Sequence, residues 1–142
     1  MNRKVLLSTL VAASLLSGCA TGLNSIQKRE YEAFKHDGVL VKEKEPVVGA
    51  LLGILPGGGS FYAGEAGLGL ANLMFWPMSV LWDPVSGYNG SVAINYDITK
   101  LKLRKEKEKE INALDEKLAL EQLTQKEYIL AKREIEQKYS YE

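Results

Sequence analysis

The chain has 142 residues, and its 18 Lys and Arg residues balance 18 Asp and Glu residues, so the formal net charge is zero. This length allows one modest domain with appendages. The balanced charge lacks the positive field that nucleic-acid binding needs. Because the chain has one Cys and one His, an internal disulfide and the usual ligand set of a zinc site are both excluded. We therefore expect no nucleic-acid partner, no metal site and no cofactor.

The first 18 residues have the pattern of an export signal. Arg3 and Lys4 precede an uncharged run over residues 5–16, which is too short for a permanent membrane span and is typical of a signal-peptide core. The run ends in Leu16-Ser17-Gly18-Cys19, which resembles the lipobox of bacterial lipoproteins. The resemblance implies that residues 1–18 are removed and that Cys19 is acylated and anchors the chain to a membrane. A secreted chain with a free thiol is the alternative.

The residue after Cys19 bears on which membrane is used. In enteric lipoproteins an Asp at this position signals retention in the inner membrane, whereas this chain has Ala20. The resemblance therefore implies a periplasm-facing protein, with the outer membrane favoured over the inner membrane.

Residues 19–45 are polar and form a lipidated N-terminus and tether. Residues 27–35 predict a short helix that ends at the turn signal around Asp37 and Gly38. Residues 39–41 are apolar and predict a short strand that stops before Pro46. His36 has no second ligand or nucleophile nearby in the sequence, so we interpret it as a solvated residue.

Residues 46–82 contain a single charge, Glu65, as expected for a membrane-inserted or deeply buried segment. A turn signal at residues 56–60 divides this segment into two arms. Small residues recur every four positions on both arms, at Gly49, Gly53 and Gly57 and again at Ala63, Gly67 and Ala71. This spacing predicts a glycine-rich hydrophobic helical hairpin over residues 46–85, packed through these small residues. Glycines that merely mark loops are the alternative.

The length of the arms leaves the relation of this hairpin to a bilayer open. The first arm covers residues 47–55 and the second covers residues 66–82 with Pro77 inside, whereas a full crossing takes about 20 residues. The hairpin therefore spans the bilayer, dips into it or lies on it. Trp76 and Trp82 suit a headgroup boundary as well as a protein core.

Three short motifs resemble the two-transmembrane-helix domain family, in which a glycine-rich turn runs into Phe-Tyr-x-Gly. They are Leu55-Pro56-Gly57-Gly58-Gly59-Ser60-Phe61-Tyr62-Ala63-Gly64-Glu65, then Gly67-Leu68-Gly69, then Leu81-Trp82-Asp83. The resemblance implies a hairpin architecture and no particular chemistry.

Residues 86–99 predict a turn followed by a short strand. Val92, Ile94, Tyr96 and Ile98 alternate with smaller or polar residues, which is the pattern of a half-buried strand. Since a lone strand is unstable in water, we expect it to pair with residues 39–41.

Residues 100–142 carry eleven basic and ten acidic residues and lack Gly and Pro, which predicts solvated helix. Thr124 and Glu127 form a capping-box pattern that starts a second helix, so we expect a charged C-terminal helical hairpin. The region resembles the short C-terminal domain known as SHOCT through Leu114, Leu118, Leu123, Thr124, Glu127, Tyr128 and Lys132. That resemblance implies an interaction or oligomerisation module; a plain charged helical tail is the alternative.

The sequence contains no recognisable catalytic motif. The glycines at residues 57–59 lack the Lys of a phosphate-binding loop. The carboxylates of Glu65 and Asp83 border the apolar segment, where solvation or a helix start explains them. We therefore predict a protein that is not an enzyme and has no catalytic residues.

The predicted fold is mainly α, with a glycine-rich hydrophobic helical hairpin, a short β element and a charged C-terminal helical hairpin. The predicted function is that of a non-enzymatic cell-envelope lipoprotein acting as a lipid-anchored scaffold or interaction protein. Its expected partners are the membrane, through acylated Cys19 and the hydrophobic hairpin, and a protein or second copy, through the C-terminal helices. A membrane-active protein that oligomerises into a pore is the alternative.

Replacing Cys19 with Ser removes the sulfur that the acyl group needs. The Cys19→Ser variant should therefore lose acylation and remain as the full-length precursor, or become soluble if the hairpin does not hold it in the membrane. Growth with labelled fatty acid, followed by isolation of the protein, measures this directly. Label that still enters the variant would contradict the lipoprotein prediction.

Overall fold

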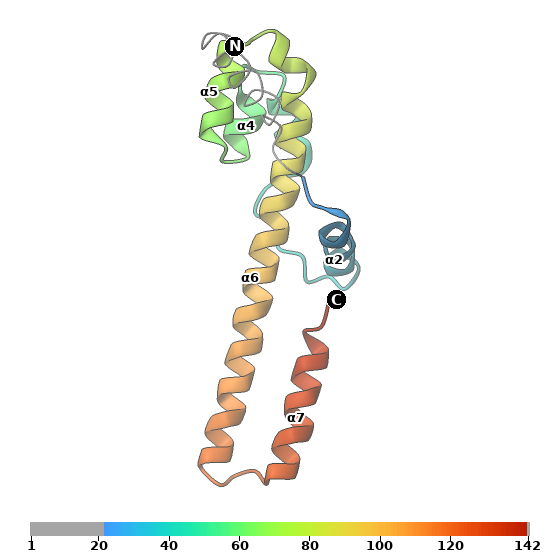
Figure 1. Ribbon diagram of the computed structural model, residues 1–142, viewed down its shortest axis with the longest axis vertical. Helices are drawn as coiled ribbons and strands as arrows, with labels where there is room; N and C mark the ends of the chain where they lie inside the picture. Colours follow the sequence, from blue (N-terminus) through green and yellow to red (C-terminus); the bar gives the residue numbers. More distant parts are fainter. Residues whose placement is uncertain (1–21, 142) are drawn as a thin grey trace, which may run out of the picture. The chain divides into compact units, whose positions relative to one another are not determined.

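The computed structural model describes residues 22–141, and within that range it contains six α-helices, one short 3-10 helix and no strand (Figure 1). The prediction of a mainly α protein is therefore confirmed. The predicted signal peptide over residues 1–18 and the predicted lipidation site, Cys19, lie outside the described residues.

The chain forms two compact units. Unit 1 contains Lys42–Asn95 together with residues 22–24, and unit 2 contains Ser25–Val41 together with residues 96–141. The longest helix, α6 (Asp83–Ala119), contributes its first part to unit 1 and the remainder to unit 2.

Unit 1 holds α3 (Pro46–Leu52), α4 (Gly58–Tyr62), α5 (Ala66–Met74), the 3-10 helix η1 (Met78–Leu81) and the start of α6. The predicted two-armed hairpin is replaced by this set of short helices. The expected turn becomes α4, entered through Gly57 in the left-handed conformation (φ 69°) that favours glycine. No helix among residues 22–141 is both long enough and apolar enough to cross a membrane.

The predicted turn and strand over residues 86–99 are wrong, because these residues belong to α6. Ser91, Asn95 and Thr99 are each at most 1% exposed, and they recur every four residues, which is the period of a helix face. The alternating apolar residues that predicted a strand are only partly buried here, apart from Tyr96. The buried face of this helix is made of small polar side chains, a pattern that a search for apolar periodicity overlooks.

Unit 2 holds α2 (Ser25–His36), the remainder of α6 and α7 (Gln125–Lys138). The helix predicted within residues 27–35 is confirmed as part of α2. Phe34 is 1% exposed, and its ring stacks on Tyr96 and meets the edge of Tyr141 at centroid distances of 5.9 and 5.0 Å. The core of unit 2 is therefore aromatic and apolar.

The strand predicted at residues 39–41 is also wrong. The backbone N–H groups of Val39 and Leu40 donate to the carbonyl oxygen of Phe34 and close the end of α2. The N–H of Val41 donates to the Thr99 hydroxyl at 2.9 Å, so this segment bonds to a side chain of a helix instead of to a strand.

Helix α7 lies alongside the last part of α6 (Figure 1). The Tyr128 hydroxyl donates to Asp115 at 2.7 Å, and the Lys138 ammonium donates to Glu110 at 2.6 Å. The predicted capping box is present, because the Thr124 hydroxyl accepts from the N–H of Glu127 and the Glu127 carboxylate accepts from the N–H of Thr124.

Candidate functional site

The centre of unit 1 is a buried carboxylate. Asp83 is fully buried at the first residue of α6. It accepts hydrogen bonds from the N–H groups of Gly59 and Ser60 at 3.1 and 3.0 Å, and from the side-chain amide of Asn72 at 2.8 Å. The Ser60 hydroxyl donates to the same carboxylate. Because each oxygen has a partner, burial of this group is compensated.

The same network joins the three helices around it. The N-cap of α4 is Gly57, which has no side chain to bond the free N–H groups at the start of the helix. Asp83 of α6 accepts hydrogen bonds from these groups instead. Asn72 of α5 donates to the Ser60 hydroxyl at 2.9 Å and accepts from the Trp82 indole N–H at 2.8 Å. We call Asp83, Ser60, Asn72 and Trp82 the polar core.

A second polar connection lies further along α6. The side-chain oxygen of Asn95 accepts from the N–H groups of Glu43 and Lys44, both at 2.8 Å, and its amide donates to the Lys44 carbonyl at 2.7 Å. Asn95 thereby fixes the approach to α3 against α6.

Polar side chains dominate the buried residues of unit 1. Those that are at most 4% exposed are Ser60, Asn72, Ser79, Asp83, Ser86, Ser91 and Asn95, whereas Leu23 and Ala63 are its buried hydrophobic residues. The hydroxyls of Ser79 and Ser86 have no hydrogen-bond partner. The two positions therefore require a small side chain, whether or not its hydroxyl is hydrogen-bonded.

The outside of unit 1 is apolar. Fifteen of its large hydrophobic side chains are exposed, and we call them the apolar surface: Val47, Val48, Leu51, Ile54, Leu55, Phe61, Leu70, Leu73, Met74, Phe75, Trp76, Met78, Leu81, Val85 and Tyr88. The exposed fractions reach 77% at Met74 and 80% at Leu81. Soluble domains normally show the opposite distribution, with large apolar side chains inside and polar ones outside.

The predicted packing glycines of the first arm lie at close backbone contacts. A methyl group at Gly49 would collide with the carbonyl oxygen of Gly87, and one at Gly53 would collide with the backbone of Pro84. Gly49 and Gly53 thus approach α6 instead of the second arm. A methyl group at Gly57 would collide with the carbonyl of Gly69 in α5.

The predicted packing residues of the second arm are placed differently from one another. Ala63 is 6% exposed, and Ala71 is half-buried. Gly67 has no neighbour within 4 Å of the space that a methyl group would fill. The close approach on α5 occurs at Gly69, where a methyl group would meet the ring of Phe61 at 2.6 Å.

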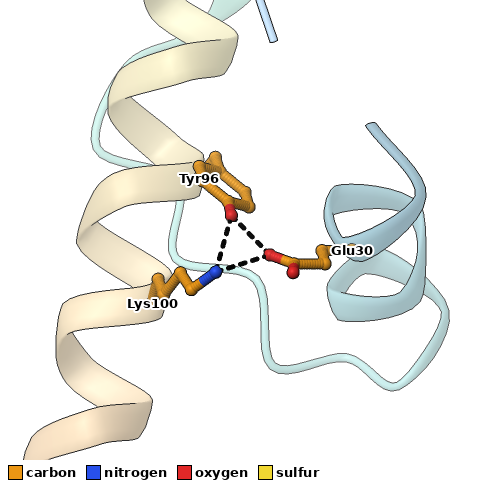
Figure 2. A network of polar contacts seen from close by, with 3 residues as sticks. All are labelled: Glu30, Tyr96 and Lys100. Carbon is orange, nitrogen blue, oxygen red and sulfur yellow. Dashed lines mark hydrogen bonds and ion pairs between the residues drawn. The ribbon is translucent and has the colours of Figure 1, made fainter. Parts of the chain in front are cut away.

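Unit 2 contains a charged network that attaches α2 to α6 (Figure 2). The Tyr96 hydroxyl donates to the Glu30 carboxylate. The Lys100 ammonium donates to Glu30 and to the Tyr96 oxygen, both at 2.9 Å. Figure 2 shows the three polar groups converging between the two helices.

The contacts in this network change the titration of all three groups. The hydrogen bond from Tyr96, followed by that from Lys100, lowers the pKa of Glu30. Burial and then the hydrogen bond to Glu30 raise the pKa of Tyr96. The hydrogen bonds to Tyr96 and Glu30 raise the pKa of Lys100. Glu30 is therefore held as an anion and Lys100 as a cation, which suits an attachment more than proton transfer.

A cleft of about 550 Å³ lies beside this network in unit 2. Its walls include the basic side chains Lys100, Arg104 and Lys107 of α6 and the aromatic rings of Phe34 and Tyr139. Among residues 22–141, no group of three or more His, Cys, Asp or Glu side chains is placed to hold a metal ion.

The sequence interpretation of Asp83 was a solvated carboxylate or a helix start; it is at a helix start but is fully buried. Ser60, Asn72 and Asn95 were not singled out. A usable signal was the recurrence of Asp83, Gly87, Ser91, Asn95 and Thr99 at intervals of four.

Comparison of the chain with protein-family models, with curated proteins and with solved structures gives no match.

Close packing at Gly49 predicts a strong contrast with Gly67, which also lies in a short helix. Gly49→Ala should lower the free energy of unfolding by about 2 kcal/mol through overpacking against Gly87. Gly67→Ala should be neutral, or stabilising by about 0.5 kcal/mol through reduced chain entropy. Thermal unfolding of both variants in the same detergent measures the difference. Equal effects would contradict the close packing of Gly49 against Gly87.

The lowered pKa of Glu30 predicts acid sensitivity of unit 2. A carboxylate with a depressed folded-state pKa contributes stability above its ordinary pKa of 4.5 and loses that contribution as the pH falls further. The helical signal of the protein should therefore become less resistant to denaturant below about pH 4.5, and Glu30→Gln should flatten this dependence. Glu32→Gln, which alters an exposed carboxylate of the same helix, is the control. Parallel pH profiles for wild type and Glu30→Gln would overturn the expectation.

Proposed function

We propose that the chain is a non-enzymatic cell-envelope lipoprotein that acts as a lipid-anchored scaffold. The observation that carries the proposal is the reversed polarity of unit 1, whose buried residues are mainly small and polar and whose exposed side chains are large and apolar. This arrangement suits a hydrocarbon solvent, where apolar burial gains nothing and helices associate through close packing of small residues and through hydrogen bonds.

The energy available from such a surface is large. Complete removal of one large apolar side chain from water is worth about 1.5–3 kcal/mol, so fifteen half-exposed side chains represent on the order of 10 kcal/mol. That amount adds to the binding supplied by the acyl chains that Cys19 is proposed to carry. The membrane is accordingly the first partner, and the periplasmic side of the outer membrane is favoured over the inner membrane because of Ala20.

Unit 2 supplies the interaction part of the proposal. Its charged helical hairpin, formed by α7 and the adjoining part of α6, has a solvated surface with few apolar side chains. Ile129 and Leu130 are adjacent on α7 and are 47% and 50% exposed. Together with the cleft, which is lined by three basic, two acidic and several aromatic side chains, they support a role in binding a protein partner or a second copy.

The proposal predicts that unit 1 binds lipid without the acyl chains. The chain from residue 19 onward with Cys19→Ser should float with neutral vesicles in a density gradient, because the apolar surface remains. Adding Leu51→Lys and Leu81→Lys should abolish flotation, since both side chains are exposed and a cation in hydrocarbon is costly.

The matched control places the same charges at exposed apolar positions of unit 2, as Leu120→Lys and Ile129→Lys, and should float like the parent. Equal flotation of the two double variants, both helical by circular dichroism, would overturn the membrane role of unit 1. Concentration-dependent dye release from the vesicles would instead favour a pore. A photo-crosslinker at Leu130 that captures neither a partner nor a second copy in cells would overturn the scaffold role.

A further inference from the structure

Contacts between α3 and α6 define two heights along the axis of α6 within unit 1, which we call levels. Before α3 begins, the backbone of Lys44 is hydrogen-bonded to the Asn95 side chain of α6. At the end of α3, Gly53 packs on Pro84 near the start of α6. Gly49 lies between them, against Gly87. The two helices are therefore antiparallel, with an Asn95 level at one end and an Asp83 level at the other.

The charges on the approach to α3 lie near the Asn95 level. The charged run over residues 42–45 is bound there through the backbone of Glu43 and Lys44. The Tyr62 hydroxyl accepts from the N–H of Glu45, and the Lys44 ammonium lies 4.8 Å from the centre of the Tyr62 ring. Glu65, just before α5, is seven residues from Asn72, whose side chain reaches Asp83, so about 10 Å of helix separates it from the Asp83 level. We call this set the charged belt.

The opposite end is apolar. Ile54 and Leu55 follow Gly53, and Met74 follows Asn72, whose side chain reaches Asp83. The segment from Phe75 to Leu81 then leads into Asp83, and the exposed side chains at this end are Ile54, Leu55, Met74, Phe75, Trp76, Met78 and Leu81. Asp83, the charge at this level, is enclosed in the polar core. We call these seven residues the apolar tip.

The distance between the two levels matches one half of a bilayer. Asn95 and Pro84 are eleven residues apart on α6, which corresponds to about 16 Å of helix. The hydrocarbon core of a bilayer is about 30 Å thick, so one leaflet accounts for roughly 15 Å.

The start of the described chain indicates which leaflet is involved. Gly22 lies against α6 within unit 1, where a methyl group on it would be 3.2 Å from the Asn89 side chain. Cys19 is three residues earlier in the chain, and three fully extended residues span roughly 11 Å of backbone. The acyl chains proposed for Cys19 would therefore enter the membrane close to unit 1.

We propose that unit 1 is immersed in a single leaflet of the bilayer, the one that holds the acyl chains, with the charged belt at the headgroups and the apolar tip near the midplane. This inference rests on the proposed lipid-anchored function and adds the depth and orientation of the inserted unit. A bilayer leaflet is the occupant that fits, because its hydrocarbon depth matches the spacing between the belt and the tip.

The test uses the acylated protein added from detergent to preformed vesicles, with one cysteine introduced at the belt as Glu65→Cys or at the tip as Trp76→Cys. Both positions are exposed. A membrane-impermeant maleimide is supplied either outside the vesicles or sealed inside them. Glu65→Cys should be labelled from outside, whereas Trp76→Cys should be labelled from neither side. Labelling of both after detergent is added confirms that the thiols are reactive.

Each other result overturns the inference in a distinct way. Labelling of Trp76→Cys from inside would mean that the unit crosses the bilayer. Labelling of Trp76→Cys from outside, in protein that floats with the vesicles, would mean that the unit lies on the surface. Protein that does not float at all would overturn the proposed function itself. Fluorescence quenching of the native Trp76 and Trp82 by brominated lipids gives a second readout that needs no substitution at the tip. Bromines near the ends of the acyl chains should quench most strongly. Stronger quenching by bromines near the headgroups would contradict a tip at the midplane.

Discussion

The hydrogen bonds accepted by the Asp83 carboxylate are the constraint on which unit 1 depends. Helices α3, α4 and α5 have seven, five and nine residues, and helices of that length are not stable alone. Asp83 connects the start of α6 to the start of α4, and Asn72 brings α5 to the same carboxylate. Gly49 and Gly53 let α3 approach the same stretch of α6 without intervening side chains. With the interior filled by backbone and small polar groups, the large apolar side chains have no place except the outside.

Local signals made part of this structure predictable from the sequence. The capping box at Thr124, the helix around residues 27–35 and the helical character of the charged C-terminal region each depend on neighbouring residues, and the structure has them. The glycine spacing on the first arm correctly indicated close backbone approach. It did not identify the partner, because a row of small residues fits any helix that presents a similar row. The actual partner of Gly49, Gly87 on α6, lay in a segment that was interpreted as a turn.

The error over residues 86–99 has the same physical origin as the reversed polarity of unit 1. Reading a strand from Val92, Ile94, Tyr96 and Ile98 assumes that apolar residues identify the buried face. In this part of α6 the buried face instead consists of Ser86, Gly87, Ser91 and Asn95. The rule that apolar residues lie inside holds for an ordinary water-soluble core, and it fails in this part of α6, where small and polar side chains fill the interior.

Helix α6 contains both kinds of core in one continuous element. Its buried positions up to Thr99 are small or polar apart from Tyr96, and the next ones are Leu103 and Leu114. Unit 2 is closer to the ordinary pattern, because it encloses Phe34, Tyr96 and two leucines, and its buried charged residue, Glu30, is paired with Lys100. In water such a core is stabilised by removing apolar surface from solvent, whereas in hydrocarbon the same burial contributes little and hydrogen bonds with close packing must hold the helices together. The change in the composition of the buried face between Asn95 and Leu103 is the change that the proposed immersion of unit 1 in a leaflet predicts, and it falls within a few residues of the charged belt.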